Sequence, residues 1–176
     1  MSNYRRAWHA DGTYFFTVNL LRRRGNDLLT RYIDLLRRVV HSVRARHPFH
    51  LHGWVVLPEH LHCGIELPPG DADFATRRRL IKLEFSKVLP KDEHLSPVRA
   101  ARGERRIWQR RYWEHLIRDD KDMQAHMDYV HFNPVKHGLV ECVADWPHST
   151  FHKLVKAGIY PPDWAGGVAD ALGYDD

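Results

Sequence analysis

Apolar side chains gather at four places along this chain in runs that are typical of β-strands. Residues 13–21 are rich in aromatic and β-branched side chains and end at a basic, glycine-containing turn. Residues 49–57 and 60–67 form two more runs, and only a Pro-Glu joint separates them, which predicts an antiparallel pair. Residues 107–117, with tryptophan, tyrosine, leucine and isoleucine, predict the fourth strand.

Between these runs, apolar residues recur at the spacing of amphipathic helices. Residues 28–47 and 74–88 show this pattern, and a third helix is expected from an aspartate cap near residue 119 to about residue 132. Pro134 disfavours helical geometry at the residue before it and is expected to end that helix. The order strand, helix, strand, strand, helix, strand, helix matches the split βαβ arrangement. We therefore expect an α+β, ferredoxin-like antiparallel sheet with helices on one face and the other face open to a ligand.

The length of 176 residues suits one sizeable core and therefore one compact unit. We expect residues 1–140 to form this domain and residues 141–176 to be a C-terminal tail that packs on it. Residues 90–106 are polar and basic and predict a flexible loop. No apolar stretch is long enough to cross a bilayer, the N-terminal residues lack the apolar core of a signal peptide, and two cysteines are too few for a disulfide framework. These features predict a cytoplasmic protein without a membrane segment.

Charge adds a moderate bias toward polyanions. The chain carries 27 Lys and Arg against 22 Asp and Glu, a formal net charge of +5. In residues 99–113, arginines such as Arg110 and Arg111 alternate with rings on which unpaired nucleobases can stack. A solvated loop that runs into an aromatic core strand explains this stretch equally well. Weaker signals for nucleic-acid binding come from Arg5, Arg6 and Lys136.

Histidine is the commonest metal-ligating side chain, and 14 histidines is a high number for this length. In His60-Leu61-His62 both rings point to the same face of a strand and can converge on one cation. The spacing is not decisive, because about one His-x-His is expected by chance at this histidine content. His50-Leu51-His52 repeats the pattern, so the spacing alone leaves both pairs as candidates or as ordinary surface histidines.

The third predicted helix offers further groups for such a site. Tyr129 lies four residues before Asn133 and three after His126, so all three point toward one side of the helix. Tyrosine can act as a nucleophile, and the asparagine oxygen would complete a nitrogen and oxygen site suited to Mg²⁺ or Mn²⁺. His126 is the alternative third ligand if the helix ends at Asn133. On pattern alone, an ordinary half-buried aromatic residue is the better interpretation of Tyr129. The apolar stripe expected to dock this helix on the sheet comprises Met123, Met127 and Val130.

Motifs in a fixed order along nearly the whole chain add a separate argument. They are Tyr4-Arg5-Arg6, Phe15 to Leu20 (FFTVNL), Trp54 to Cys63 (WVVLPEHLHC), Ile107-Trp108-Gln109, Trp113-Glu114-His115, Asp128-Tyr129, Asn133 to Gly138 (NPVKHG), Asp145-Trp146-Pro147 and Ser149 to His152 (STFH). This ordered combination resembles the REP-associated tyrosine transposases, which are bacterial relatives of the single-tyrosine transposases of small insertion sequences. The combination is far more specific than any one of its motifs.

The resemblance implies a nuclease of the HUH type, in which a His-hydrophobic-His motif holds a divalent cation. It assigns this motif to His60 and His62, the third ligand to Asn133 and the nucleophile to Tyr129. The implied cofactor is Mg²⁺ or Mn²⁺, and the implied partners are single-stranded DNA hairpins of repetitive extragenic palindromes with an unpaired foot. The resemblance also implies a nucleoid-associated monomer that cuts through a 5′-phosphotyrosine and can rejoin strands at the same site.

Three other functions stay open at this point. A non-catalytic nucleic-acid-binding regulator could use the same fold, although the loss of Tyr129 or of a histidine would have favoured it and neither is lost. A rolling-circle replication initiator would share the histidine pair but usually brings a helicase or a longer origin-binding region. A small metallohydrolase could use all four strand histidines, and it would form no covalent adduct with DNA.

Overall fold

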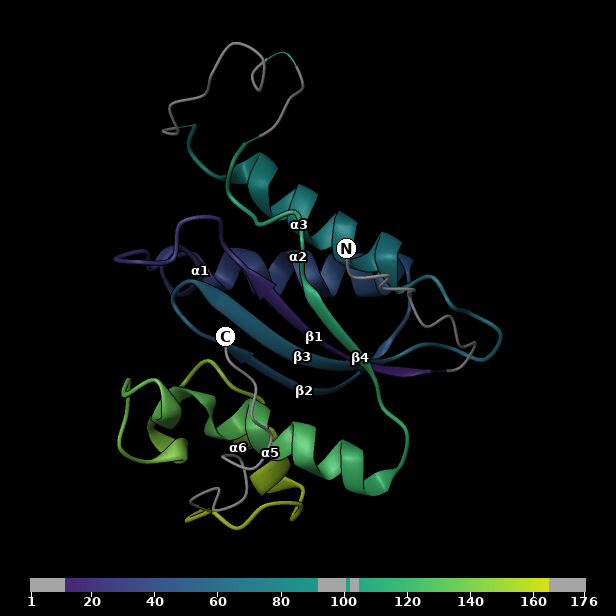
Figure 1. Ribbon diagram of the computed structural model, residues 1–176, viewed down its shortest axis with the longest axis vertical. Coiled ribbons are helices and arrows are strands. Elements are labelled where there is room, and N and C mark those ends of the chain that lie inside the picture. The colour runs from purple at the N-terminus through teal and green to yellow at the C-terminus, as the bar shows by residue number, and fades with distance from the viewer. Residues whose placement is uncertain (1–11, 92–100, 102–104, 165–176) are drawn as a thin grey trace, which may run out of the picture.

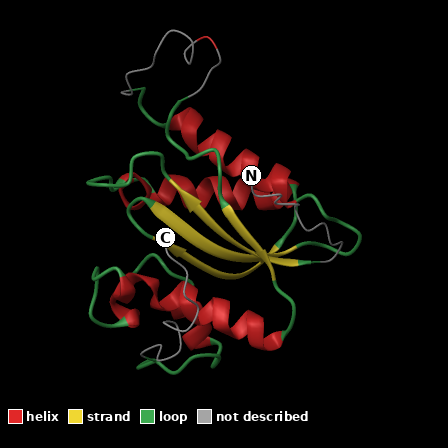
Figure 2. Ribbon diagram, in the orientation of Figure 1, coloured by secondary structure: helices red, strands yellow, loops and turns green. Residues whose placement is uncertain are grey.

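The computed structural model describes residues 12–91, 101 and 105–164, and it has a central sheet between two layers of helices (Figure 1). α2 and α3 cover one face of the sheet, and α5 lies on the other (Figure 2). The described elements are β1 (Thr13–Asn19), α1 (Leu28–Arg31), α2 (Ile33–Arg46), β2 (His50–Val56), β3 (His60–Glu66), α3 (Phe74–Val88), β4 (Trp113–Leu116), α5 (Asp120–Lys136), the short 3-10 helix η1 (Val143–Asp145) and α6 (Phe151–Lys156).

The sheet has the strand order β2-β3-β1-β4, and each pair of neighbours is antiparallel. This order places β3 between β1 and β2, and β1 between β3 and β4, as the split βαβ arrangement requires. The prediction of an α+β, ferredoxin-like fold is therefore confirmed. In the β1–β3 ladder, Thr17 lies opposite His62 and Asn19 lies opposite His60.

The first face of the sheet carries the main hydrophobic core. Side chains alternate between faces along a strand, so Tyr14, Phe16 and Val18 of β1 share this face with Leu61 and Ile65 of β3. The apolar sides of α2 and α3 complete the cluster. Burial of this apolar area is the dominant stabilising contribution for a domain of this size.

The second face also carries apolar side chains, and α5 covers part of it. Phe15 of β1 and Val55 of β2 pack against Met127 and Val130 of α5. The helix approaches the sheet closely where the strands carry glycine: a Cβ added to Gly64 would lie 2.6 Å from Met127 Cε. The expectation that helices lie on one face only was wrong in this respect, because strands with apolar residues on both faces must be covered on both.

Several predicted boundaries differ from the structure. The helix expected over residues 28–47 is divided at Tyr32 into α1 and α2. α5 continues through Pro134 to Lys136, because a proline in the last turn removes one N–H donor while the His137 N–H still bonds to the Asn133 carbonyl at 3.0 Å. The fourth strand is shorter than residues 107–117. Gln109 N–H bonds to the Asn19 carbonyl, and the ladder with β1 resumes only at Trp113, opposite Thr17. Residues 110–112 therefore form a bulge.

The chain after α5 folds back onto that helix. Val143, Phe151 and Tyr160 form a small core with Phe132 and Val135. The Tyr160 hydroxyl donates a 2.7 Å hydrogen bond to Asp128, the residue before Tyr129. Segment 148–150 also bonds to β2, so the described part of the tail fixes both the helix and the sheet edge. None of the helices within the described ranges has the length and apolar character that a membrane span requires.

Candidate metal and nucleophile site

β3 places His60 and His62 side by side on the face of the sheet that α5 covers. Both histidines are 0% exposed, whereas Leu61 between them points into the main core. Their ring centroids lie 4.9 Å apart, with an angle of 85° between the ring planes. The two rings therefore lie close together and are both fully buried.

Both rings have a partner at Nδ1. His62 Nδ1 lies 2.8 Å from Thr17 Oγ1 across the β1–β3 ladder, and His60 Nδ1 lies 3.1 Å from Glu59 Oε1. Burial alone would raise the pKa of the Glu59 carboxyl. The hydrogen bond with His60 and the nearby Arg23 guanidinium outweigh this effect, so the pKa lies below its ordinary value. The other nitrogen of His60, Nε2, is buried and has no hydrogen-bond partner among the described residues.

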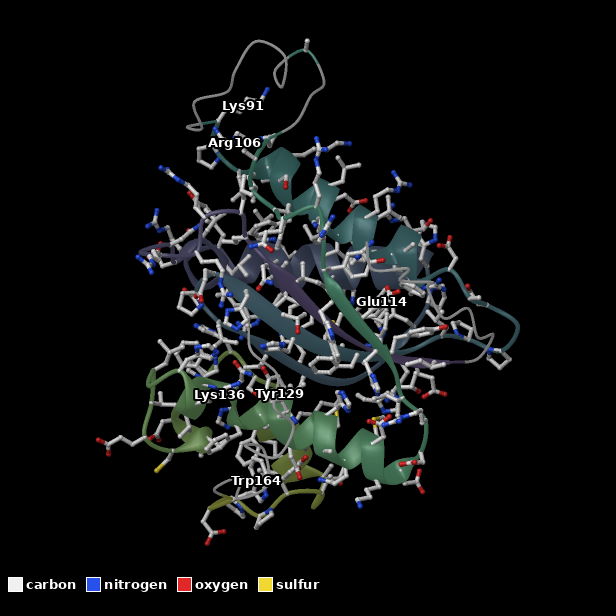
Figure 3. All side chains as sticks on the ribbon, viewed as in Figure 1. Lys91, Arg106, Glu114, Tyr129, Lys136 and Trp164 are labelled. Carbon is white, nitrogen blue, oxygen red and sulfur yellow. The ribbon has the colours of Figure 1, made fainter. Side chains whose placement is uncertain are left out.

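α5 brings Tyr129 to this pair, and Lys136 lies on the same helix (Figure 3). Its ring centroid lies 5.2 Å from that of His62, at an interplanar angle of 77°. Phe15 packs edge-on against the tyrosine at 6.1 Å, and Lys136 Nζ lies 5.0 Å from the centre of the tyrosine ring. Tyr129 is 2% exposed, whereas Lys136 is exposed. Lys136, at the C-terminal end of α5, therefore connects the buried tyrosine ring with the protein surface.

Asn133 follows Tyr129 by one helical turn, and His137 follows Asn133 by another. The His137 ring lies 5.0 Å from the His60 ring, so Asn133 lies between two residues that contact the histidines. Asn133 is 0% exposed, and both of its side-chain polar atoms are buried without a hydrogen-bond partner in the described part of the chain.

These residues fit a divalent cation. A buried polar atom without a partner is costly, and its cost is removed when a ligand binds it. His60 Nε2 and Asn133 Oδ1 are two such atoms, and Asn19 Oδ1, opposite His60 in the ladder, is a third. Imidazole nitrogens with amide oxygens form a mixed set that suits Mn²⁺, and Mg²⁺ with additional water ligands.

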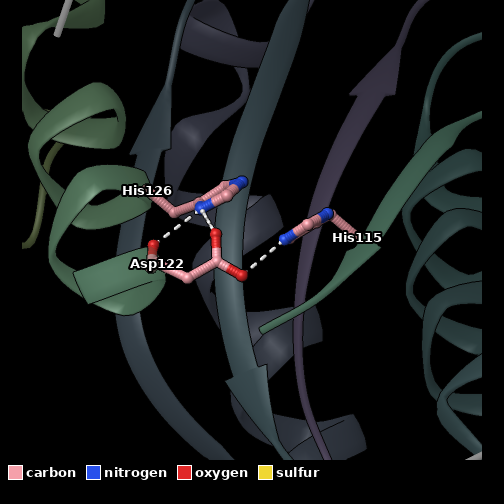
Figure 4. A group of neighbouring side chains, drawn as sticks. All are labelled: His115, Asp122 and His126. Carbon is pink, nitrogen blue, oxygen red and sulfur yellow. Dashed lines mark hydrogen bonds and ion pairs between the residues drawn. The ribbon is translucent and has the colours of Figure 1, made fainter. Parts of the chain in front are cut away.

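His126, the alternative third ligand, belongs to a different cluster (Figure 4). His126 Nδ1 lies 2.7 Å from the Asp122 carbonyl oxygen and 3.0 Å from its Oδ1, and His115 Nε2 lies 2.8 Å from Asp122 Oδ2. The three side chains offer ligand atoms within 4.8 Å of one another, close enough to hold a metal. Although burial raises the pKa of Asp122, hydrogen bonds from His115 and Arg118 lower it to about 2.

The second His-x-His pair lies elsewhere. His50 and His52 are on β2, and their ring centroids are 4.5 Å apart. His50 is exposed, and His52 Nε2 bonds to Glu66 Oε2 at 2.7 Å. Burial, followed by the nearby charge of His52, lowers the pKa of His50. His52 is thus paired with Glu66, whereas the Tyr129 ring lies beside His62.

The candidate nucleic-acid residues are spread over the molecule. Arg110 and Arg111 are exposed in the bulge before β4 and line an open groove of about 700 Å³ with Lys82 and Trp108. Burial lowers the pKa of Lys82 to about 8, and its Nζ donates to the Gln109 carbonyl at 2.7 Å. Lys136 instead lies beside Tyr129, at the C-terminal end of α5. Arg5 and Arg6 lie outside the described residues.

Sequence reasoning missed several side chains that surround the histidine pair. Thr17 and Asn19 could have been found only by knowing the register of β1 with β3. Glu59 and His137 had a local signal, because Glu59 directly precedes His60 and His137 continues the four-residue spacing of Tyr129 and Asn133.

Comparisons with known proteins agree with these motifs. The chain is 49% identical over 170 residues to the REP-associated tyrosine transposase of Escherichia coli K12, an alignment that covers 97% of this chain and 94% of the relative. A Haemophilus influenzae relative with the same family description is 47% identical over 167 residues and 94% of each chain. No family model matches the chain.

A solved structure extends the agreement to three dimensions. It superimposes with a TM-score of 0.82 at 49% identity, covers 96% of this chain and 93% of the other, and is described as a REP-associated tyrosine transposase bound to a REP hairpin. Identity of this level over nearly the full length of both chains is shared ancestry, and the fold is shared with it. The chain belongs to the family of REP-associated tyrosine transposases.

Proposed function

We propose that this protein is a metal-dependent, single-tyrosine endonuclease and strand transferase that acts on single-stranded DNA hairpins of the REP type. The observation that carries the proposal is the Tyr129 ring 5.2 Å from His62, in a site with buried, unsatisfied ligand atoms on His60 and Asn133. The hairpin in the solved relative supports the substrate class. In this proposal residues 1–140 carry the site, and residues 141–176 are a tail of the same domain.

Tyr129 is the nucleophile in this reaction. Its phenol loses a proton to solvent, and Oη then forms a bond to phosphorus while the bond from phosphorus to the 3′ oxygen breaks. The 3′ oxygen takes up a proton, and the DNA stays attached through a 5′-phosphotyrosine. The phosphodiester bond count is conserved, so the 3′-hydroxyl of another strand can reverse the step and join the strands.

His60, His62 and Asn133 hold the cation, which is Mg²⁺ or Mn²⁺. When bound there, it supplies positive charge that stabilises the negative charge developing on the phosphate. Lys136 adds a second positive charge, with its Nζ 5.0 Å from the centre of the Tyr129 ring. Its ammonium group favours the phenolate and attracts the DNA backbone.

Arg110 and Arg111 bind the phosphates of the hairpin in the groove beside β4, and Arg5 and Arg6 are proposed as further phosphate contacts. A REP hairpin has a paired stem and an unpaired foot, so the groove and the site can each receive a different part. Tyrosine and histidines lie in one chain, which supports action as a monomer.

The assignment of the histidines is tested by cleavage of hairpin oligonucleotides in Mn²⁺. His60→Ala and His62→Ala should reduce cleavage at least 100-fold and leave hairpin binding largely intact, because phosphate and base contacts supply most of the affinity. His50→Ala is the matched control and should cleave at the parent rate. An inactive His50→Ala beside an active His62→Ala would overturn the assignment.

A second location for the cation has support from geometry, because His115, Asp122 and His126 offer converging ligand atoms. Each of them already has a hydrogen-bond partner within the cluster, which favours a structural link between β4 and α5. His115→Ala discriminates between the locations. Loss of Mn²⁺ binding in this variant, with binding retained in His62→Ala, would move the cation to the second cluster.

A further inference from the structure

The geometry points to Glu59 and Thr17 as positioning residues that orient His60 and His62 for a cation. This inference rests on the metal site proposed above. Neither residue need touch the cation, because each contacts the opposite nitrogen of its histidine. Metal-ligating histidines depend on such partners, which fix both the tautomer and the direction of the ring.

Glu59 determines which nitrogen of His60 carries the proton. An ionised carboxylate accepts hydrogen bonds and cannot donate them, so the bond at 3.1 Å requires the proton to be on Nδ1. The lone pair of the neutral ring is then on Nε2, which is the buried atom without a partner in the described ranges. Glu59 thus keeps the lone pair on His60 Nε2, the atom that would bind the cation, even when no cation is bound.

The backbone around Glu59 is well anchored. The Leu20 N–H bonds to the Glu59 carbonyl at 2.8 Å, and the Leu29 N–H bonds to the Pro58 carbonyl at 3.0 Å. Arg23 lies 3.6 Å from the same carboxylate oxygen that meets His60. The turn between β2 and β3 is thus tied to the end of β1 and to α1, and this restricts the positions that the carboxylate can take.

Thr17 performs the same task for His62 from the neighbouring strand. Its hydroxyl can donate or accept, but a cation at Nε2 of His62 requires the proton on Nδ1, and Thr17 Oγ1 is then the acceptor at 2.8 Å. Thr17 is 7% exposed and lies opposite His62 in the ladder, so the sheet itself holds this acceptor in place.

The test is Mn²⁺ affinity, measured by calorimetry on the full chain without DNA. Glu59→Ala and Thr17→Val remove the acceptor and should weaken Mn²⁺ binding by about 10- to 100-fold. Glu59→Gln and Thr17→Ser keep an acceptor oxygen at the same place and should stay within about threefold of the parent. The matched control is Glu66→Ala, which removes the equivalent carboxylate partner of His52 outside the site. It should bind Mn²⁺ like the parent.

The results separate this inference from the site on which it rests. Parent-like binding in Glu59→Ala and Thr17→Val, together with lost binding in His62→Ala, overturns the positioning roles and leaves the metal site intact. Undiminished binding in His62→Ala overturns the metal site and the inference with it. Equal losses in Glu59→Gln and Glu59→Ala also contradict the inference, because they show that an acceptor at Nδ1 is not what matters. If Glu59→Ala does not unfold cooperatively on heating, Glu59→Asp replaces it in the test. Its shorter side chain holds the carboxylate farther from His60, so this variant should also bind Mn²⁺ more weakly than the parent.

Discussion

At the scale of single residues, the site is marked by polar atoms that the protein buries and does not satisfy. A buried donor or acceptor without a partner costs about 1–3 kcal/mol. His60 Nε2, Asn133 Oδ1 and Asn19 Oδ1 are such atoms. Asn19 lies opposite His60 in the β1–β3 ladder, and Asn133 lies one helical turn after Tyr129. These unsatisfied atoms destabilise the folded protein, and a bound ligand would satisfy them, which is typical of a binding site.

His131 makes a separate prediction about stability and pH. It is 0% exposed on α5, and burial lowers its pKa to about 4. A histidine titrates near pH 6.5 in the unfolded chain. Between these values the unfolded state binds more protons, so the contribution of His131 is fully present above about pH 6.5 and is lost as pH falls toward 4.

The expected slope from this residue is at most about 1.4 kcal/mol per pH unit, measured by urea unfolding between pH 4.5 and 7. His131→Gln cannot ionise and should flatten the profile, even if it lowers stability at neutral pH. His41→Gln, at an exposed position on α2, is the control and should leave the slope unchanged. An unchanged slope in His131→Gln would contradict the assignment.

At the scale of elements, catalysis as proposed depends on how closely α5 is held against β2 and β3. Met127 packs into the space that Gly53 and Gly64 leave on the strands, and an added Cβ would lie 2.5 Å and 2.6 Å from its terminal atoms. Tyr129 is two residues farther along the helix. The fit of Met127 against the two glycines thus helps to hold the α5 segment that carries the nucleophile against the sheet.

Gly64→Ala should lower the free energy of unfolding by about 1 kcal/mol, because the flexible end of Met127 must move to admit the methyl group. In a Met127→Ala background, the same substitution should cost nothing or stabilise the strand. A double-mutant cycle with urea unfolding measures this coupling. Additive effects of the two substitutions would show that the helix does not approach the sheet in this way.

The sequence predicted the elements with a strong periodic pattern, such as α3 over residues 74–88. It failed where tertiary contacts override local rules. Pro134 did not end α5, because residues after the helix pack on its last turns. In the predicted fourth strand, residues 110–112 form a bulge and do not pair with β1. For the site, spacing gave His60 and His62 but could not exclude His50 and His52. The Tyr129 ring beside His62 supports the proposed choice of pair, and that contact depends on the fold.

At the scale of the whole molecule, the basic groove and the histidine site lie on different sides of the sheet. α3 and residues 105–111 line the groove, whereas the site lies between β3 and α5. In the proposed complex, the stem of the hairpin would occupy one of these places and its unpaired foot the other.

Hairpin DNA should therefore bind more tightly than blunt duplex of the same sequence, and its affinity should fall steeply with salt. Arg110→Ala and Arg111→Ala should each reduce the slope of log affinity against log salt by about 1. Fluorescence anisotropy over a salt series measures this, with Arg38→Ala on α2 as the control. Equal affinity for hairpin and duplex would count against the proposed partner.

The proposed reaction joins Tyr129 covalently to DNA, and a search for that adduct tests it directly. Parent protein, a labelled single-stranded hairpin and Mn²⁺ should give a complex that survives boiling in detergent, with the 5′ phosphate on the peptide that contains Tyr129. Tyr129→Phe removes one oxygen and keeps the ring that packs on Phe15 and His62. It should bind hairpin and Mn²⁺ like the parent and give neither adduct nor cut strand. Cleavage by Tyr129→Phe would mean that water is the nucleophile, and it would contradict the account.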